Sequence, residues 1–212
     1  MARYADRSEA GRILGEAVPE AGPFDRPVVL ALPRGGVPVA VEVAAALSAP
    51  LTVIVVRKIG APGRPELAIG ALARVGSQVS TYRNSTTAAA VGIDDRSFAR
   101  AAAQARVELE RRGQAFATRE APPLADADLV LVDDGLATGS TMLAAVSAVR
   151  GLKPARVVVA VPVAPASALD ALRRVADTVI CPRVPANFVA VGLAYADFAQ
   201  LTDDDVQRML AG

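Results

Sequence analysis

Two adjacent carboxylates stand where an apolar stretch gives way to a loop of small residues. Residues 129–142 read LVLVDDGLATGSTM, so Asp133 and Asp134 directly follow a strand-like run. A helix expected to begin near Thr138–Ser140 points its unpaired N–H groups and the positive end of its dipole at this loop. Glycines that allow close backbone approach and three hydroxyl side chains complete the chemistry of a phosphate site.

The two carboxylates would repel a bound phosphate unless they faced another group. Carboxylates accept hydrogen bonds from sugar hydroxyls and bind hard cations such as Mg²⁺. A phosphorylated pentose meets both needs, because its phosphate enters the loop while its 2,3-diol reaches Asp133 and Asp134. The sequence therefore predicts a sugar-phosphate site.

Other phosphate-binding loops fit this stretch less well. A Walker loop requires G-x-x-x-x-G-K-[ST], and the loop contains no lysine; a G-x-G-x-x-G fingerprint is absent after the first expected strand. ATGST partly resembles an FMN loop, but flavodoxin-like proteins carry theirs after the first strand and lack paired acids. The structural alternative is an ordinary helix cap with two solvated aspartates.

Composition limits the classes of protein that remain. The chain has 212 residues, 52% of them hydrophobic and 21% charged, which indicates a globular protein with an ample core. This length fits one α/β domain with an elaboration or two small domains, and we expect a single domain over 1–212. A net charge of +1 argues against a large nucleic-acid footprint. With no histidine and one cysteine, Cys181, Ser-His and Cys-His pairs, His-ligated zinc and cysteine clusters are excluded. The polar first residues and the lack of a long apolar stretch predict a cytoplasmic protein without a membrane partner.

Apolar runs that alternate with helical patterns indicate the fold. Continuous apolar strands of this kind are typical of a parallel sheet covered on both faces, so we expect an α/β, doubly wound architecture. The expected strands are 27–32, 51–56, 127–133, 155–162 and 177–182, and the expected helices are 4–18, 36–48, 139–151, 165–174 and 203–211.

The stretch 59–123 does not follow the strand–helix rhythm. Residues 59–93 indicate a hairpin that turns near Gly76-Ser77, and a long polar helix is expected over 94–118. A long excursion inside a compact domain is usually a lid or an inserted subdomain, so 59–123 is the predicted lid, hairpin and long-helix insertion.

VLVDDGLATGSTM closely resembles the signature of type I phosphoribosyltransferases, which bind 5-phosphoribosyl 1-diphosphate (PRPP). The likeness extends from about residue 27 to residue 200. It implies a Rossmann-like parallel sheet with a flexible loop and a small hood. It also implies that Asp133 and Asp134 hold the ribose hydroxyls, while the 5-phosphate is held by Ala137, Thr138, Gly139, Ser140 and Thr141.

Two further stretches could bind the pyrophosphate end of the ligand. LPRGGVPVA (32–40) resembles the family's pyrophosphate loop, which often contains a cis peptide, and this implies roles for Arg34, Gly35 and Gly36. Arg57 and Lys58 are expected at the carboxyl end of the second strand, facing the same cleft, where local positive charge would chelate a diphosphate. The alternatives are an ordinary turn with a surface arginine and a solvated basic pair.

The segment 177–200 is the predicted acceptor-binding segment. VPANFVAVGLAYADF (184–198) is similar to the base-binding segment of purine salvage enzymes. The resemblance implies that Phe188 stacks on a planar acceptor and that Asp197 approaches the metal–pyrophosphate. A core phenylalanine and a helix-capping aspartate are the alternatives. Transferases for 6-oxopurines carry an acid at the position of Ala137, so hypoxanthine and guanine are disfavoured.

The resemblance implies a Mg²⁺-dependent glycosyltransferase of the pentosyltransferase class, acting in nucleotide metabolism. It would transfer the 5-phosphoribosyl group of PRPP to an acceptor nitrogen, expected on a nucleobase, and release pyrophosphate. The implied catalytic residues are Asp133, Asp134, Arg57 and Lys58, with Mg²⁺ held by Asp133 and Asp197 through water. The expected partners are PRPP and a small-molecule acceptor, and a homodimer is left open.

Two other functions remain open from the sequence. The same fold also serves regulators that bind PRPP or a nucleotide without catalysis, since function depends on the site rather than on the fold. An FMN or sugar-phosphate enzyme of another class is the third alternative.

Overall fold

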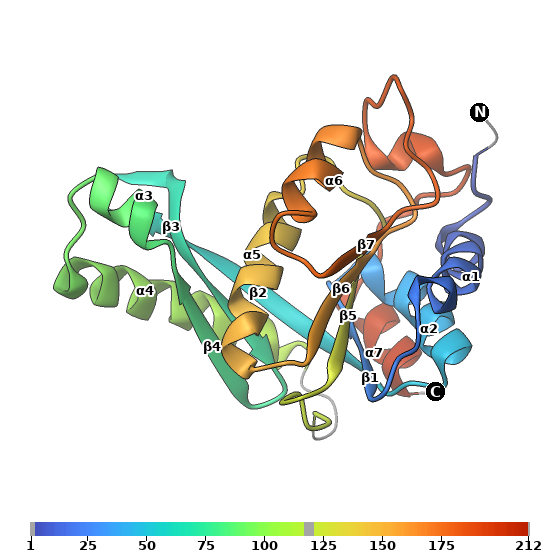
Figure 1. Cartoon of the computed structure of the whole chain (residues 1–212), viewed down its shortest axis with the longest axis horizontal. Helices are drawn as coiled ribbons and strands as arrows, with labels where there is room; N and C mark the ends of the chain where they lie inside the picture. The colour runs from blue at the N-terminus through green and yellow to red at the C-terminus, as the bar shows by residue number, and fades with distance from the viewer. Residues whose placement is uncertain (1–2, 117–120, 212) are drawn as a thin grey trace.

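The computed structural model of the chain describes residues 3–116 and 121–211. Its strands are β1 (Pro27–Ala31), β2 (Leu51–Ala61), β3 (Arg64–Val75), β4 (Gln78–Arg83), β5 (Asp128–Val132), β6 (Arg156–Ala160) and β7 (Thr178–Ile180). They form one sheet in the order β4-β3-β2-β1-β5-β6-β7 (Figure 1). The pairs from β2 through β1, β5 and β6 to β7 are parallel, whereas β2–β3 and β3–β4 are antiparallel.

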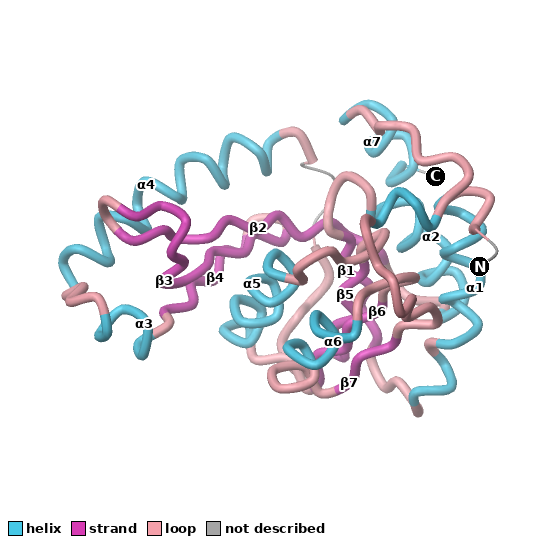
Figure 2. Tube along the Cα trace, turned by 90° about the horizontal axis from the view of Figure 1, so that it is seen from above, coloured by secondary structure: helices cyan, strands magenta, loops and turns pink. Residues whose placement is uncertain are grey.

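Helices cover both faces of the parallel part of the sheet. The helices of the chain are α1 (Arg7–Ala17), α2 (Gly36–Leu47), α3 (Ser85–Ala90), α4 (Asp95–Gln114), α5 (Ser140–Val149), α6 (Ala166–Leu172) and α7 (Asp203–Ala211), of which α3 and α4 lie away from the parallel strands (Figure 2). Figure 2 shows α5 and α6 on one side of β1, β5 and β6, with α1, α2 and α7 on the other. The predicted α/β, doubly wound, mostly parallel sheet is therefore confirmed.

Strand β5 shows why both faces must be covered. Side chains alternate between the two faces of a strand. Leu129 and Leu131 are fully buried in the cluster formed with α5 and α6, and Val130 and Val132 are fully buried in the cluster formed with α2 and α7. An apolar strand without polar positions can only be stable between two layers of helices.

The expected strand at 51–56 is too short, because β2 continues to Ala61. Only Leu51, Thr52 and Val53 pair with β1, and from Ile54 onward β2 pairs with β3 instead. The polar pair Arg57–Lys58 breaks the apolar run, but an antiparallel extension exposed on part of its surface accepts such residues. We call β3, β4, α3, α4 and this outer part of β2 the arm, which extends away from the parallel strands in Figure 1.

The arm follows the predicted insertion over 59–123 in outline. Val75 pairs with Gln78, so the hairpin turns near Gly76-Ser77 as predicted. The long helix expected over 94–118 is α4, which ends at Gln114; residues 117 and 118 lie outside the described residues. In Figure 2, α4 runs along the arm and its C-terminal end returns toward the parallel strands.

The first residues of the described chain are joined to the last part of the domain. Tyr4 forms a bridge with Tyr195, its N–H donates to the carbonyl of Ala194 (2.8 Å), and its carbonyl accepts from the N–H of Ala196 (2.7 Å). We call residues 181–202 the hood; the N-terminal segment joins it at residues 194–196, and Arg7 of α1 donates to the carbonyl of Ala199 (2.9 Å).

Candidate functional site

The loop between β5 and α5 encloses a cavity of about 130 Å³, which we call the loop cavity. It is lined by Asp133 and by residues 135–142. Gly135 (φ +154°) and Gly139 (φ +71°) adopt backbone conformations that side-chain-bearing residues rarely take. The N–H of Leu136 donates to the carbonyl of Val163 (2.9 Å), which fixes the loop to the end of β6. The phosphate loop expected from the sequence is thus a hollow at the N-terminus of α5.

Lys58 brings a positive charge from the arm to this loop. Its Nζ donates to Oγ of Ser140 (2.7 Å), the first residue of α5, and Oγ of Ser140 also accepts from Oγ1 of Thr138 (3.1 Å). An ammonium group and the positive end of a helix dipole therefore lie at one point. Both favour an anion there.

The side chains of the two adjacent aspartates lie in different environments. Asp133 lines the loop cavity, and its Oδ1 accepts from the N–H of Asp134 (2.9 Å). Asp134 does not line this cavity; its Oδ2 pairs with Nε of Arg7 from α1 (2.8 Å), and both side chains are almost enclosed, at 14% and 12% exposed. A Cβ atom on Gly35 would overlap the same carboxylate oxygen. Only a glycine therefore lets the β1–α2 loop lie on Asp134.

Burial raises the pKa of Asp133 well above its usual range, and the neighbouring charge of Asp134 raises it further. Burial also raises the pKa of Asp134, although the hydrogen bond and charge of Arg7 oppose that rise. The charge of Arg7 also acts to lower the pKa of Asp133, but its effect is smaller, and the direct hydrogen bond of Arg7 goes to Asp134. A hydroxyl or a divalent cation bound beside Asp133 would supply favourable partners for the ionised form.

The donor set fits Mg²⁺ only in part. In residues 3–116 and 121–211, no three acidic or cysteine side chains gather into a cluster that could hold a metal ion. Mg²⁺ is commonly bound by one or two carboxylates together with substrate oxygens and water, so Asp133 alone is compatible with it. Asp197 does not line the loop cavity; its Oδ1 accepts from the N–H of Ala199 (3.0 Å), as a turn-capping aspartate does. The expected joint binding of Mg²⁺ by Asp133 and Asp197 through water stays a prediction.

The predicted pyrophosphate loop lies at the carboxyl end of β1, beside the acids. The Pro33–Arg34 peptide is cis. The Arg34 side chain turns toward α7, with Nε 3.4 Å from Oδ1 of Asp203 and Nη1 donating to the carbonyl of Leu201. Arg34 also lines a second cavity of about 420 Å³, which Thr141 of the phosphate loop lines as well. The two predicted loops therefore meet at neighbouring cavities.

The expectation that Arg57 and Lys58 stand at the end of a strand is corrected by the length of β2. The two residues do share a cavity of about 670 Å³, which α4 also lines, and their role at the pyrophosphate stays a prediction. Both residues lie inside the strand, paired with Leu72 and Ala71 of β3. Successive strand residues point to opposite faces. Lys58 reaches the phosphate loop, whereas Arg57 lies toward α4, where its charge contributes to the lowered pKa of Glu108, which is due mainly to the hydrogen bond from Arg111.

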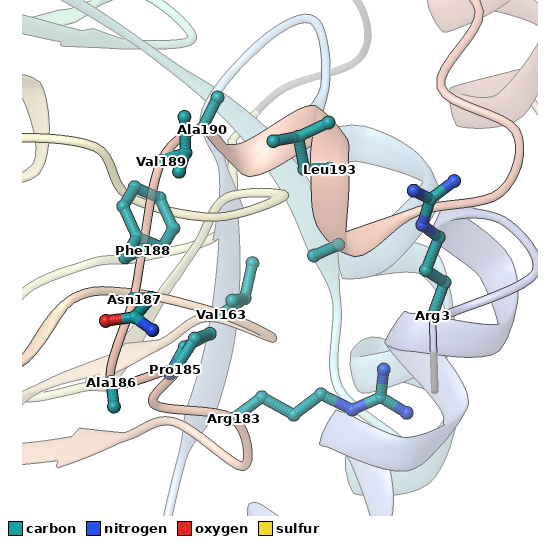
Figure 3. A pocket seen from close by; sticks show the side chains of 11 residues that line it. Arg3, Val163, Arg183, Pro185, Ala186, Asn187, Phe188, Val189, Ala190 and Leu193 are labelled. Carbon is teal, nitrogen blue, oxygen red and sulfur yellow. The ribbon is translucent and has the colours of Figure 1, made fainter. Parts of the chain in front are cut away.

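Phe188 lines a cavity of about 410 Å³ in the predicted acceptor segment (Figure 3). Its walls are mostly apolar, and Figure 3 shows Val163 near the centre with Arg183 and Arg3 at one end. Val163 also lies against Gly135, since a Cβ atom there would be 2.9 Å from its Cγ1. One side chain thus separates this cavity from the loop after the acids. The role of Phe188 in acceptor binding stays a prediction.

Sequence reasoning did not find Arg7 or Tyr195. Arg7 stands in an otherwise ordinary amphipathic helix, and the partner it reaches lies in β5's loop, so no local pattern marks it. The Tyr195 hydroxyl donates to the carbonyl of Asp134 and its ring stacks on Phe198, 5.0 Å between centroids. Arg7 lies over the other aromatic partner, 3.8 Å from the ring centroid of Phe198. These side chains hold Asp134 in place from the N-terminal and C-terminal segments.

Comparison with known proteins agrees with this geometry. The family model described as phosphoribosyl transferase domain matches residues 7–197. Two Mycobacterium tuberculosis proteins provisionally named phosphoribosyl transferase, MT0597 of strain CDC 1551 and Rv0571c of strain H37Rv, are each 41% identical over 211 residues. The match takes in 99% of this chain and 47% of each relative, so the chain spans about half their length.

Two solved structures share the fold. TT1426 from Thermus thermophilus is 43% identical, with a TM-score of 0.86 over 98% of this chain and 97% of that one. AQ2163 from Aquifex aeolicus is 11% identical, with a TM-score of 0.50 over 96% of this chain and 84% of that one. Among the described residues, no helix is both long and apolar enough to cross a membrane.

Proposed function

The chain belongs to the phosphoribosyl transferase family, and from that premise we propose that it transfers the 5-phosphoribosyl group of PRPP to a nitrogen of a small acceptor. Pyrophosphate is released in this reaction, which would be Mg²⁺-dependent. The observation that carries the proposal is the meeting of three features at the loop cavity: the N-terminus of α5, the ammonium of Lys58 and the carboxylate of Asp133.

In the proposed complex, the N–H groups at the start of α5 and the hydroxyls of Thr138, Ser140 and Thr141 hold the 5-phosphate. Asp133 accepts hydrogen bonds from the ribose hydroxyls. The resemblance implies that Asp134 also holds the ribose, but we assign it a supporting role because Arg7 and Gly35 enclose its carboxylate. Its part is to support the β1–α2 loop and to set the charge beside Asp133.

The departure of pyrophosphate leaves positive charge on the ribose C1, so no covalent nucleophile is required. The protein's contribution is to position the reactants and to stabilise charge. Lys58 and the N–H groups of the loop at Arg34 and Gly35 would face the negative charge that develops on the leaving group. When bound, Mg²⁺ would neutralise part of the diphosphate charge, with Asp133 as its protein ligand.

The acceptor is proposed to be a nucleobase that enters the cavity beside Phe188. The apolar walls of that cavity suit a planar ring, and Val163 links it to the loop that follows the acids. Ala137 offers no acid for the N7 of a 6-oxopurine, so bases other than hypoxanthine and guanine are favoured.

A second function, a PRPP-binding regulator without catalysis, is favoured by one observation. Asp134 already has a cationic partner in Arg7, which leaves Asp133 as the carboxylate at the loop cavity. A regulator needs only to bind its ligand, and the loop could do so without the second acid. Binding without turnover would distinguish this function from the proposed transferase.

The test is pyrophosphate release by the full chain in the presence of PRPP, MgCl₂ and a panel of nucleobases. We expect release with at least one base, and Asp133→Asn should lower the rate about 100-fold or more, because a group near the developing charge is lost. Asp170→Asn is the matched control, since Asp170 lies exposed on α6 and pairs only with Arg173 among the described residues.

PRPP binding is measured in parallel by thermal unfolding. A ligand at about 100 times its dissociation constant should stabilise the fold by roughly 2.7 kcal/mol. Stabilisation without release for any base would favour the regulator. The absence of both PRPP stabilisation and pyrophosphate release would contradict both functions.

A further inference from the structure

Helix α4 brings two adjacent arginines to the edge of the candidate site. Arg111 and Arg112 stand in its last turn, and both line the 420 Å³ cavity at the carboxyl end of β1 and beside the middle of β2. We call this the arginine cavity. Pro33 and Arg34 of the β1–α2 loop also line it, and so does Thr141 in the first turn of α5.

The arginine cavity adjoins the phosphate loop directly. Thr141 lines both this cavity and the loop cavity. A ligand whose phosphate occupies the loop would therefore extend into the arginine cavity past Thr141. The cis Pro33–Arg34 peptide forms part of the same wall, which places the predicted pyrophosphate loop and the two α4 arginines around one space.

The balance of charge in the cavity favours an anion. Three guanidinium groups, those of Arg34, Arg111 and Arg112, line it, whereas Asp203 is the one carboxylate among its lining residues. Asp203 pairs with Arg34, and Arg111 pairs with Glu108 on its own helix (3.1 Å). Within the described part of the chain, Arg112 has no carboxylate within the 4.0 Å of an ion pair.

Stabilisation of the helix dipole is the simpler explanation for basic residues in a last turn. The interaction with the dipole is the same for a basic residue on any side of the helix, so it does not require both side chains to line a cavity. It also gives no reason to place them opposite Arg34, since like charges repel. A diphosphate between them removes this repulsion and accepts the bidentate hydrogen bonds that arginine forms with phosphates.

We propose that Arg111 and Arg112 bind the diphosphate of PRPP and the pyrophosphate released from it. The inference rests on the proposed function and adds a second contribution of the arm beside that of Lys58, because the end of α4 also serves the leaving group. Closure of the cavity by α4 places these cations on an element remote in sequence from both predicted phosphate loops.

Isothermal titration of the full chain with Mg²⁺–pyrophosphate and, separately, with ribose 5-phosphate tests this assignment. Ribose 5-phosphate keeps the loop contacts and lacks the diphosphate. In the variant Arg111→Gln/Arg112→Gln we expect pyrophosphate affinity to fall at least tenfold and ribose 5-phosphate affinity to change less than twofold. Arg112→Gln alone should account for most of the loss, and Arg112→Lys should restore part of it.

The control is Arg106→Gln, on the same helix, where the exposed side chain pairs with Glu110 (3.0 Å). Unchanged pyrophosphate affinity in the double variant, with tight binding by the wild type, overturns the inference and leaves the proposed function standing. Equal losses of affinity for both ligands would show that the arginines act through the fold, and this result also overturns the inference. A wild type that binds ribose 5-phosphate but not pyrophosphate overturns it as well, and one that binds neither ligand contradicts the proposed function itself.

Discussion

The phosphate loop and the arm contribute to the same site by different routes. The loop takes its chemistry from neighbours in sequence: β5, Asp133, Gly139 and the start of α5 follow one another within residues 128–142. The arm contributes single side chains across long distances, as Lys58 does at Ser140 and Arg111 and Arg112 do at the arginine cavity. Residues that are neighbours in sequence therefore form the phosphate loop, and elements remote in sequence determine the charge around it.

The largest expected effect separates Lys58 from its neighbour in the arm. Lys58→Ala should reduce turnover about 10³-fold, because it removes a cation hydrogen-bonded to the first residue of α5 in a site where such charge is preorganised. Arg57→Ala should reduce it less than tenfold, because Arg57 points toward α4. Steady-state kinetics of both variants measure this difference.

Equal losses in the two variants would show that Arg57 and Lys58 act together, as the sequence first suggested. Full activity in both would mean that the arm's contact with Ser140 is only a surface interaction.

The next effect concerns the N-terminal segment. Arg7→Gln should destabilise the fold by about 3 kcal/mol, because it leaves the almost enclosed carboxylate of Asp134 without its cation. Urea unfolding measures the change, and Arg12→Gln is the control, since Arg12 is exposed on the same helix. If both variants lose the same small amount of stability, α1 does not act through Asp134.

The smallest expected effect is a pH dependence at Asp133. Its pKa is raised on folding, so the folded chain keeps a proton that the unfolded chain has released above about pH 4, the ordinary range of aspartate. The free energy of unfolding then falls as pH rises from that range toward the raised pKa. Asp133→Asn should remove this loss and so make the apo protein more stable than the wild type near pH 7.

Asp177 supplies the opposite sign as a control. Partial burial raises its pKa, but hydrogen bonds from Arg150 and from the N–H of Val157 outweigh that effect and lower the pKa overall. Asp177→Asn should therefore lose stability near neutral pH and approach the wild type in acid. Chemical unfolding of both variants at pH 4 and pH 7 provides the test, and a gain for Asp133→Asn at pH 4 as large as that at pH 7 would contradict the raised pKa.

The parallel strands and the phosphate loop could be predicted from the sequence, because the patterns that indicate them are local. Apolar runs such as PVVLAL and ADLVLVD report burial on both faces, and the acids, glycines and hydroxyls after β5 report the loop. The direction of Asp134 could not be predicted, since adjacent carboxylates look alike until the positions of Gly35 and Arg7 are known.

The arm was harder to predict for a physical reason. The outer part of β2 pairs with β3, and Arg57 and Lys58 there are half-buried and exposed, so polar residues can stand inside the strand and a polar pair no longer marks its end. The cations of α4 give no local signal either. Their interleaving with Glu108 and Glu110 is typical of an exposed helix, and only the tertiary path of α4 shows what they line.

The bridge between Tyr4 and residues 194–196 has a consequence for synthesis on the ribosome. A growing chain emerges from its N-terminal side, and a domain generally folds as a unit. Helix α1 is made before α2, and Arg7 can pair with Asp134 only after β5 and its loop have been made. The hydrogen bonds that fasten Tyr4 to Ala194 and Ala196 must wait for nearly the whole domain. The N-terminal segment therefore stays without its partner until the hood has been made, late in the synthesis of the domain.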